Sequence, residues 1–269
     1  MGSYEVSHAR LQRAITHGER LAKLWNEIPD GRLITPKVLV DPKGFGVLLA
    51  TSVGQIPDEM PLLLGEMLYQ LRSALDACIY QGSIYATNQD PPPKDGSLEF
   101  PIAKNPDEWP RLRERRLFNL PIPWQEALER IQPYNVKFLP PEQLIKSVGR
   151  SLGMLHDLAR KDRHRKLHVV GSWPMDAKPE FSLPKGIGVA SLEMMPPSVL
   201  KEGTMIARFR VIGDRGGDLG YMNPKLKTTF GCAEPDLPPP CAPSDTFELR
   251  LAEMVKSVAG VIDSFERNL

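Results

Sequence analysis

The sequence predicts an α+β fold that is mainly an α-helical bundle of four to five helices with a small antiparallel β-sheet insertion. Two observations lead to this class. Apolar residues recur every three to four positions in long segments near both ends and in the middle of the chain, which is the periodicity of amphipathic helices. Between these segments lie short β-rich runs that are separated by proline and glycine, as expected for strands of an antiparallel sheet.

The individual elements follow from local signals. Pro61 opens one helix at a position where proline is tolerated, and Ser244 or Asp245 can cap the last helix. The runs PKVLV and FGVLLATS, separated by the turn signal DPKG, predict a β-hairpin. Because helices at both ends enclose the β-rich segments, we expect a single domain over residues 1–269. Its helices are expected at 4–27, 61–85, 141–165 and 246–267, with β-rich insertions at 36–52 and 168–231.

The overall composition is that of a globular protein. The chain has 269 residues, of which 41% are hydrophobic and 25% charged. Lys and Arg total 34 against 33 Asp and Glu, so the net charge is only +1. No global field therefore selects nucleic acid or an acidic membrane, and any binding of anions must be local. Charges throughout the first 25 residues exclude a signal peptide or a membrane span there, which favours a cytoplasmic protein without a membrane partner.

The three cysteines, Cys78, Cys232 and Cys241, are odd in number and lack CxxC spacing. They are expected to be free thiols in a reducing cytoplasm, and a structural zinc site built on them is disfavoured.

The stretch ARKDRHRKLH, residues 159–168, is where the sequence hints at chemistry. If the helix continues that far, its period of about 100° per residue places His164 and His168 on one polar ridge with His156 and Arg160. Asp162 projects instead from the apolar side. A carboxylate there must be paired, lie at an open cleft or mark the end of the helix, because an unpaired buried charge is costly.

Residues 163–168, Arg-His-Arg-Lys-Leu-His, resemble the R-[N/H/D]-x-x-x-H signature of HEPN-domain proteins. The resemblance implies a helical bundle that acts as a metal-independent ribonuclease or binds nucleotides, in which Arg163 and His168 of two protomers meet at a dimer interface. A toxin or defence effector, with an antitoxin of unknown identity, is consistent with this activity. No cofactor and no metal are implied.

Elementary chemistry is compatible with such a site. Cleavage of RNA by the neighbouring 2′-hydroxyl needs a base, an acid and cations that neutralise the phosphorane. His164 and His168 can titrate near neutral pH, and Arg163 can bind phosphate through two parallel donors. We therefore take Arg163, His164 and His168 as candidate catalytic residues.

A second resemblance covers about two thirds of the chain. The ordered segments LRSALDA (71–77), FPI (100–102), QPY (132–134) and DRHR (162–165) are similar to LRSALDH, FPI, QPY and DKHR in a group of bacterial proteins, chiefly actinobacterial, with no settled activity. In the basic segment this resemblance selects Asp162, His164 and Arg165, whereas the HEPN resemblance selects Arg163 and His168. It also differs from this chain at Arg163 and Ala77.

Arg72 and Asp76 lie one helical turn apart and can form an ion pair. They could reach Asp162, His164 or Arg165 and orient a functional cluster, or they could belong to an inter-helix salt-bridge network that fixes the register of the bundle. We take Arg72, Asp76, Asp162 and Arg165 as supporting residues.

Two alternatives to catalysis remain open. Positive side chains in the last turn of a helix are favoured by the helix dipole alone, so the polar cluster could be purely structural. A non-catalytic bundle protein that binds a nucleotide or small anion is the competing function. A metal site built from His156, His164 and His168 is disfavoured, because HRKLH lacks the glutamate of HExxH and carries two cations between its histidines.

Overall fold

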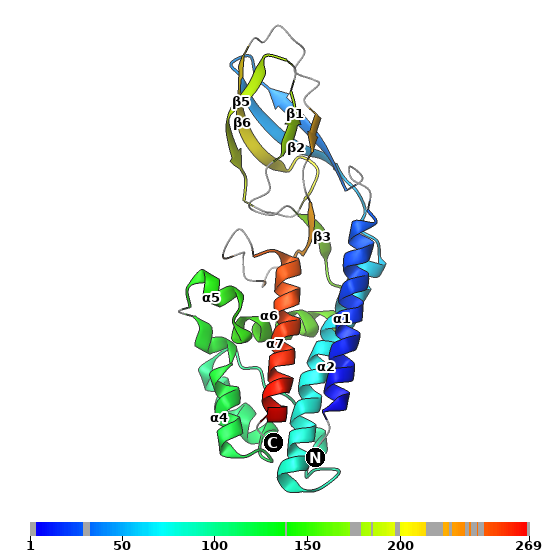
Figure 1. Cartoon of the computed structure of the whole chain (residues 1–269), viewed down its shortest axis with the longest axis vertical. Helices are drawn as coiled ribbons and strands as arrows, with labels where there is room; N and C mark the ends of the chain where they lie inside the picture. The colour runs from blue at the N-terminus through cyan, green and yellow to red at the C-terminus, as the bar shows by residue number, and fades with distance from the viewer. Residues whose placement is uncertain are drawn as a thin grey trace.

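The structure is a computed structural model, and it describes residues 4–28, 33–137, 139–172, 179–183, 185–196, 200–213, 223–225, 228–234, 237, 241 and 245–267. Three long helices run along the long axis of the molecule, and a β-sheet stands at one end of them (Figure 1). The start of the first helix and the end of the last lie together at the opposite end, where the rings of Tyr4 and Phe265 are 6.1 Å apart.

Seven α-helices are present among the described residues. The three long ones pack side by side, and α6 crosses them (Figure 1). The helices are α1 (Glu5–Asn26), α2 (Glu59–Thr87), α3 (Trp109–Arg116), α4 (Ile122–Arg130), α5 (Pro141–Ile145), α6 (Val148–Asp162) and α7 (Phe247–Arg267), with short 3-10 turns at Asp95–Ser97, Pro106–Glu108 and Pro133–Val136.

The principal sheet is antiparallel and has four strands in the order β1-β2-β6-β5. Two further ladders, β3 with β8 and β4 with β7, have two strands each. The strands are β1 (Ile34–Val40), β2 (Phe45–Val53), β3 (Val169–Ser172), β4 (Glu180–Ser182), β5 (Ile187–Met194), β6 (Met205–Gly213), β7 (Asn223–Lys225) and β8 (Thr229–Cys232).

The expected fold, an α+β protein that is mainly a helical bundle with a small β-sheet insertion, is wrong because the sheet is more than an insertion. The protein is an α+β fold whose four-stranded sheet has its own hydrophobic core beside the helical core. The hairpin β1-β2 was expected, but it pairs with β6, which lies about 150 residues further along the chain. Local periodicity carries no signal for such a long-range pairing, because it reports only which face of each strand is buried.

The predicted helical stripe on α2 is confirmed. Its apolar side chains are buried between α1, α6 and α7, and Leu64, Leu68, Leu71 and Leu75 are completely buried. Aromatic contacts continue this core toward the sheet, since Trp25 at the end of α1 packs on Phe230 of β8, which packs on Phe247 of α7. The helical core is therefore continuous across the elements that lead into the β-rich half.

The inner face of the sheet is closed by β4 and β7. Phe181 of β4 packs on Phe209 of β6 with ring centroids 5.0 Å apart. The ring of Phe209 in turn lies against Gly46 of β2, where a Cβ atom would stand 2.3 Å from the ring. Gly46 is thus required by the close approach of an aromatic side chain rather than by a turn.

The single helix expected over 141–165 is interrupted and ends early. Residues Pro141–Ile145 form α5, a new helix begins at Val148, and it ends at Asp162. The Ser147 hydroxyl accepts a hydrogen bond from the Arg150 amide, which caps the start of α6. Arg163, His164 and Arg165 therefore follow the helix instead of forming its last turn.

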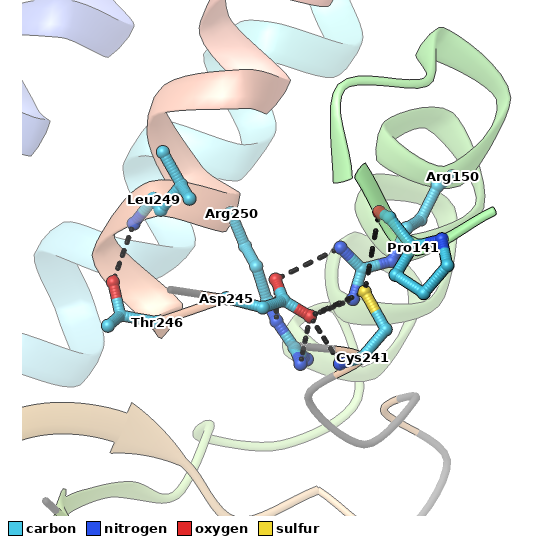
Figure 2. Close-up of polar contacts among 7 residues, drawn as sticks. All are labelled: Pro141, Arg150, Cys241, Asp245, Thr246, Leu249 and Arg250. Atoms are coloured by element: carbon cyan, nitrogen blue, oxygen red, sulfur yellow. Dashed lines mark hydrogen bonds and ion pairs between the residues drawn. The ribbon is translucent and has the colours of Figure 1, made fainter. Parts of the chain in front are cut away.

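A buried carboxylate connects the starts of α6 and α7. Asp245 accepts hydrogen bonds from Arg150 of α6 at 2.6 and 3.0 Å and from Arg250 of α7 at 3.0 Å (Figure 2). It also accepts from the Cys241 amide at 2.9 Å. Because its side chain is occupied in this way, the Thr246 hydroxyl, and not Asp245, accepts from the Leu249 amide in the first turn of α7; Ser244 lies outside the described residues.

The two arginines hold Asp245 in its ionised form. Burial alone would raise the pKa of this carboxyl group, but the hydrogen bonds from Arg150, Cys241 and Arg250 outweigh burial and lower the pKa well below its usual range. The side chain of Asp245 is completely buried and those of both arginines are nearly so. The arrangement is a buried charge network whose integrity depends on the central carboxylate.

Among the described residues, none of the helices combines the length and apolar character that a bilayer span requires.

We predict that Asp245→Ala lowers the free energy of unfolding by about 3–5 kcal/mol, because it leaves two buried guanidinium groups that repel each other. Urea denaturation measures this loss. Asp263→Ala is the matched control, since Asp263 is half exposed and lies 3.7 Å from an exposed Arg267, and it should change stability by less than about 1 kcal/mol. Equal losses for the two variants would contradict a central role for Asp245.

Candidate functional site

The basic segment, residues 160–168, lies at the junction between α6 and β3. After α6 ends, the amides of His164 and Arg165 both donate to the Lys161 carbonyl and form a turn. Leu167 is buried and anchors the segment to the core, and the His168 carbonyl accepts from the Ala233 amide beside β8. The polar ridge that a continuous helix would have made is absent, because His164 and His168 lie beyond its end.

Glu234 binds one part of the basic segment. Its buried carboxylate accepts from Arg165 at 2.5 and 3.1 Å and from the His168 amide at 3.2 Å, and Lys161 stands 3.4 Å away. Burial by itself would raise the pKa of Glu234, but these hydrogen bonds lower it. Arg165 and Lys161 are therefore engaged by the protein's own carboxylate.

Lys166 is engaged at the surface. Its ammonium group donates to Asp58, which directly precedes α2, at 2.5 Å. This hydrogen bond lowers the pKa of the Asp58 carboxyl group. The pair is exposed, with 95% of the Asp58 side chain open to solvent, so its contribution to stability is small.

Four side chains of the basic segment are exposed and could bind an external ligand. Arg160, Arg163, His164 and His168 are exposed, and no side-chain hydrogen bond or ion pair connects them to any of the described residues. The structure thus places all three candidate catalytic residues, Arg163, His164 and His168, at the surface. We name the four side chains the basic surface.

Asp162, the last residue of α6, faces α2 rather than the basic surface. Its carboxylate lies over Gly65, where a Cβ atom would stand 2.5 Å from both carboxylate oxygens. Burial raises the pKa of this carboxyl group. Asp162 therefore marks the end of the helix, which is one of the roles that the sequence left open for it.

Arg72 and Asp76 hold the FPI segment in place. Arg72 donates to the Phe100 carbonyl at 2.5 Å and to Glu99 at 2.8 Å, and Asp76 accepts from the Phe100 amide at 2.9 Å. The two side chains are 3.3 Å apart. Arg116 of α3 completes the cluster by binding Glu99 at 2.7 Å. Arg72 and Asp76 thus bind Glu99 and Phe100, whereas Arg165 binds Glu234.

Gln132 of the QPY segment binds the backbone of the same irregular segment. Its buried amide accepts from the Ala103 amide at 2.8 Å and donates to the carbonyls of Pro101 and Leu128. LRSALD, FPI and QPY therefore meet in one place, where side chains satisfy a buried length of irregular backbone. These three motifs have a structural explanation that requires no ligand.

His156 is the histidine that remains on α6. It is half buried, and burial together with the nearby Arg72 guanidinium lowers its pKa, so the ring is neutral at neutral pH. Its neighbour Asp157 is buried and binds Lys104 at 2.8 and 3.0 Å. In the described part of the chain, no three His, Cys, Asp or Glu side chains come together in a way that could hold a metal ion.

Sequence reasoning did not predict which carboxylates bind the arginines: it named Asp245 only as a possible helix cap and did not name Glu234 or Glu99. Glu234 and Asp245 lie in or beside the proline-rich loop after β8, where no periodicity exists to place them. Glu99 directly precedes the FPI motif, so the second resemblance pointed to the neighbouring residues but not to Glu99 itself. The adjacency of these carboxylates to their arginines depends on tertiary structure.

No protein-family model, curated protein or solved structure matches this chain.

We predict that Glu234→Gln lowers the free energy of unfolding at pH 7 by about 1.5–3 kcal/mol, the range for hydrogen bonds to charged groups. Because the folded-state pKa of Glu234 is depressed, its stabilisation is present above the usual glutamate pKa of about 4.3 and is lost as the pH falls through the folded-state pKa. The difference in the free energy of unfolding between the wild-type protein and Glu234→Gln should therefore shrink as the pH falls below the usual glutamate pKa.

Urea denaturation at several pH values, with the exposed Glu193→Gln as control, measures this dependence. A difference that stays constant down to acid pH would show that ionised Glu234 is not its source.

Proposed function

We propose that the chain binds the phosphate groups of RNA or a nucleotide through the basic surface, without a metal and without catalysing a reaction. The proposal rests on the observation that only some cations of the basic segment are paired with carboxylates. Lys161, Arg165 and Lys166 have carboxylate partners, whereas Arg160 and Arg163 are exposed without one among the described residues. Arginine offers parallel donors to phosphate, and unpaired exposed arginines pay no cost of breaking an internal ion pair on binding.

The basic surface is a local excess of positive charge on a chain whose overall charge is nearly neutral. A net charge of +1 provides no long-range attraction for nucleic acid, so contacts must come from a confined surface. His164 and His168 add two exposed side chains whose ring nitrogens can donate hydrogen bonds to phosphate.

The resulting prediction concerns salt dependence. For single-stranded RNA, each lost phosphate contact should reduce the slope of log affinity against log salt by about 0.7. Arg160→Gln/Arg163→Gln should therefore reduce the slope by about 1.4 in a fluorescence anisotropy titration. Arg111→Gln/Arg115→Gln, which removes two exposed arginines from one face of α3, is the matched control and should leave the slope unchanged. Equal slopes for all three proteins would refute the proposal.

Metal-independent cleavage of RNA is the second candidate. It is favoured by the adjacency of Arg163 and His164 in one exposed turn, which offers a phosphate ligand and an imidazole side by side. This candidate predicts that the protein degrades total RNA in the presence of a chelator and that His164→Ala/His168→Ala does not. No degradation, or equal degradation by both proteins, would eliminate it and leave binding alone.

A further inference from the structure

The four-stranded sheet exposes one of its faces. Along β2, Gly46, Leu48 and Ala50 are buried, whereas the alternating Phe45, Val47 and Leu49 point the other way and are partly or fully exposed. The neighbouring strands alternate in the same manner. We name this side the outer face and define it by Lys37, Leu39, Phe45, Val47, Leu49, Arg208, Arg210 and Ile212.

Strand register arranges the outer face in parallel columns. Phe45 of β2 lies directly opposite Arg210 of β6, and Val47 lies opposite Arg208. An apolar column on β2 therefore runs beside a basic column on β6, and successive members of a column are about 7 Å apart along the strand. The Arg210 guanidinium lies over the Phe45 ring, 5.4 Å from its centroid.

The charge and the exposure of this face indicate that it binds another molecule. Among the described residues, Lys37, Arg208 and Arg210 outnumber the two carboxylates beside them. Glu193 lies opposite Arg208, and Asp41 lies opposite Phe45, where its carboxylate accepts from the Lys43 and Phe45 amides. Between the cations stand large apolar side chains that are about half exposed: Phe45 at 56%, Ile212 at 51% and Leu39 at 45%. Contiguous exposed apolar side chains bordered by cations are typical of a binding surface rather than of a solvated sheet.

The columns fit a polymer that has a charged edge and a flat apolar edge. Single-stranded RNA has both, since its phosphates can follow the basic column while its unpaired bases stack on aromatic rings and guanidinium planes. A duplex hides its bases, and an anionic membrane requires cations around an apolar centre rather than a column beside one. We infer that the outer face binds single-stranded RNA through Phe45, Arg208 and Arg210.

This inference rests on the proposed function, because it adds a second surface for the same class of ligand and specifies that the ligand is single-stranded. The basic surface supplies contacts to phosphate alone, which duplex and single strand share. The outer face adds stacking, which only unpaired bases can use. The two contributions can therefore be separated by the strandedness of the RNA.

The test compares a fluorescein-labelled oligouridine with a duplex RNA of equal length, titrated with the full chain and followed by anisotropy. The wild-type protein should bind the single strand more tightly, and Phe45→Ala should weaken that binding about tenfold, as expected for the loss of one stacked base. Binding of the duplex should hardly change. Phe118→Ala is the matched control, because Phe118 is also exposed and also lies beneath a cation, Lys94, at 5.5 Å.

Further variants and probes decide between the outcomes. Arg208→Gln/Arg210→Gln should weaken single-strand binding and reduce its salt slope by about 1.4. Equal wild-type affinity for single strand and duplex, or equal effects of Phe45→Ala and Phe118→Ala, overturns the inference. Cosedimentation with phosphatidylserine vesicles that is lost in Phe45→Ala, without any effect on RNA binding, overturns it in favour of a membrane surface.

Failure of the proposed function has a different signature. If the Arg160→Gln/Arg163→Gln variant keeps the wild-type salt slope while Phe45→Ala weakens single-strand binding, the outer face is an RNA site and the basic surface is not. If the reverse holds, the basic surface binds phosphate and the outer face has no part in it. Circular dichroism and thermal unfolding of each variant verify that these exposed substitutions leave the fold intact.

Discussion

The carboxylate of Glu234 connects the two halves of the molecule and decides what the basic segment can do. It lies just beyond β8 and binds Lys161 in α6, Arg165 in the following turn and the His168 amide before β3. The ladder of β3 and β8 and the end of α6 are thereby held at one point. Because a buried carboxylate requires cationic partners, two cations of the segment are used internally. With Lys166 bound to Asp58, the side chains left for an external anion are those of Arg160, Arg163, His164 and His168.

The segments LRSALD, FPI and QPY also satisfy polar groups inside the molecule. Arg72, Asp76 and Gln132 satisfy the polar backbone of residues 99–103, which runs between helices without regular structure. Such a buried stretch is unstable unless each amide and carbonyl finds a partner. Residues of this kind are constrained by folding as strongly as catalytic residues are constrained by chemistry. Motifs alone therefore cannot distinguish the two roles, and here the contacts assign LRSALD, FPI and QPY to the fold.

Prediction from the sequence succeeded where structure is local and failed where it is tertiary. The buried stripe of α2 and the hairpin of β1 and β2 follow from periods of about 3.6 and 2 residues, and both are present. The pairing of β2 with β6 was missed because it joins distant segments. The helix expected to reach residue 165 ends at Asp162, in a run of Arg, Lys and His that carries no breaker residue, although a helix end was one of the roles that the sequence left open for Asp162. The same limit applied to the site, where basic residues are conspicuous in the sequence but their partners, Glu234 and Glu99, are not.

The nearly neutral net charge conceals how unevenly charge is distributed. Asp245 and Glu234 are completely buried and bind arginines or a lysine, so these carboxylates neutralise cations inside the molecule. The exposed cations of the outer face and the basic surface are separate from these internal clusters. A protein with a net charge of +1 gains little from long-range steering, so recognition of a polyanion must depend on contacts at short range. In the proposed complex, stacking on Phe45 would supply a contact that salt does not screen, and it would sustain single-strand binding at ionic strengths that weaken the phosphate contacts.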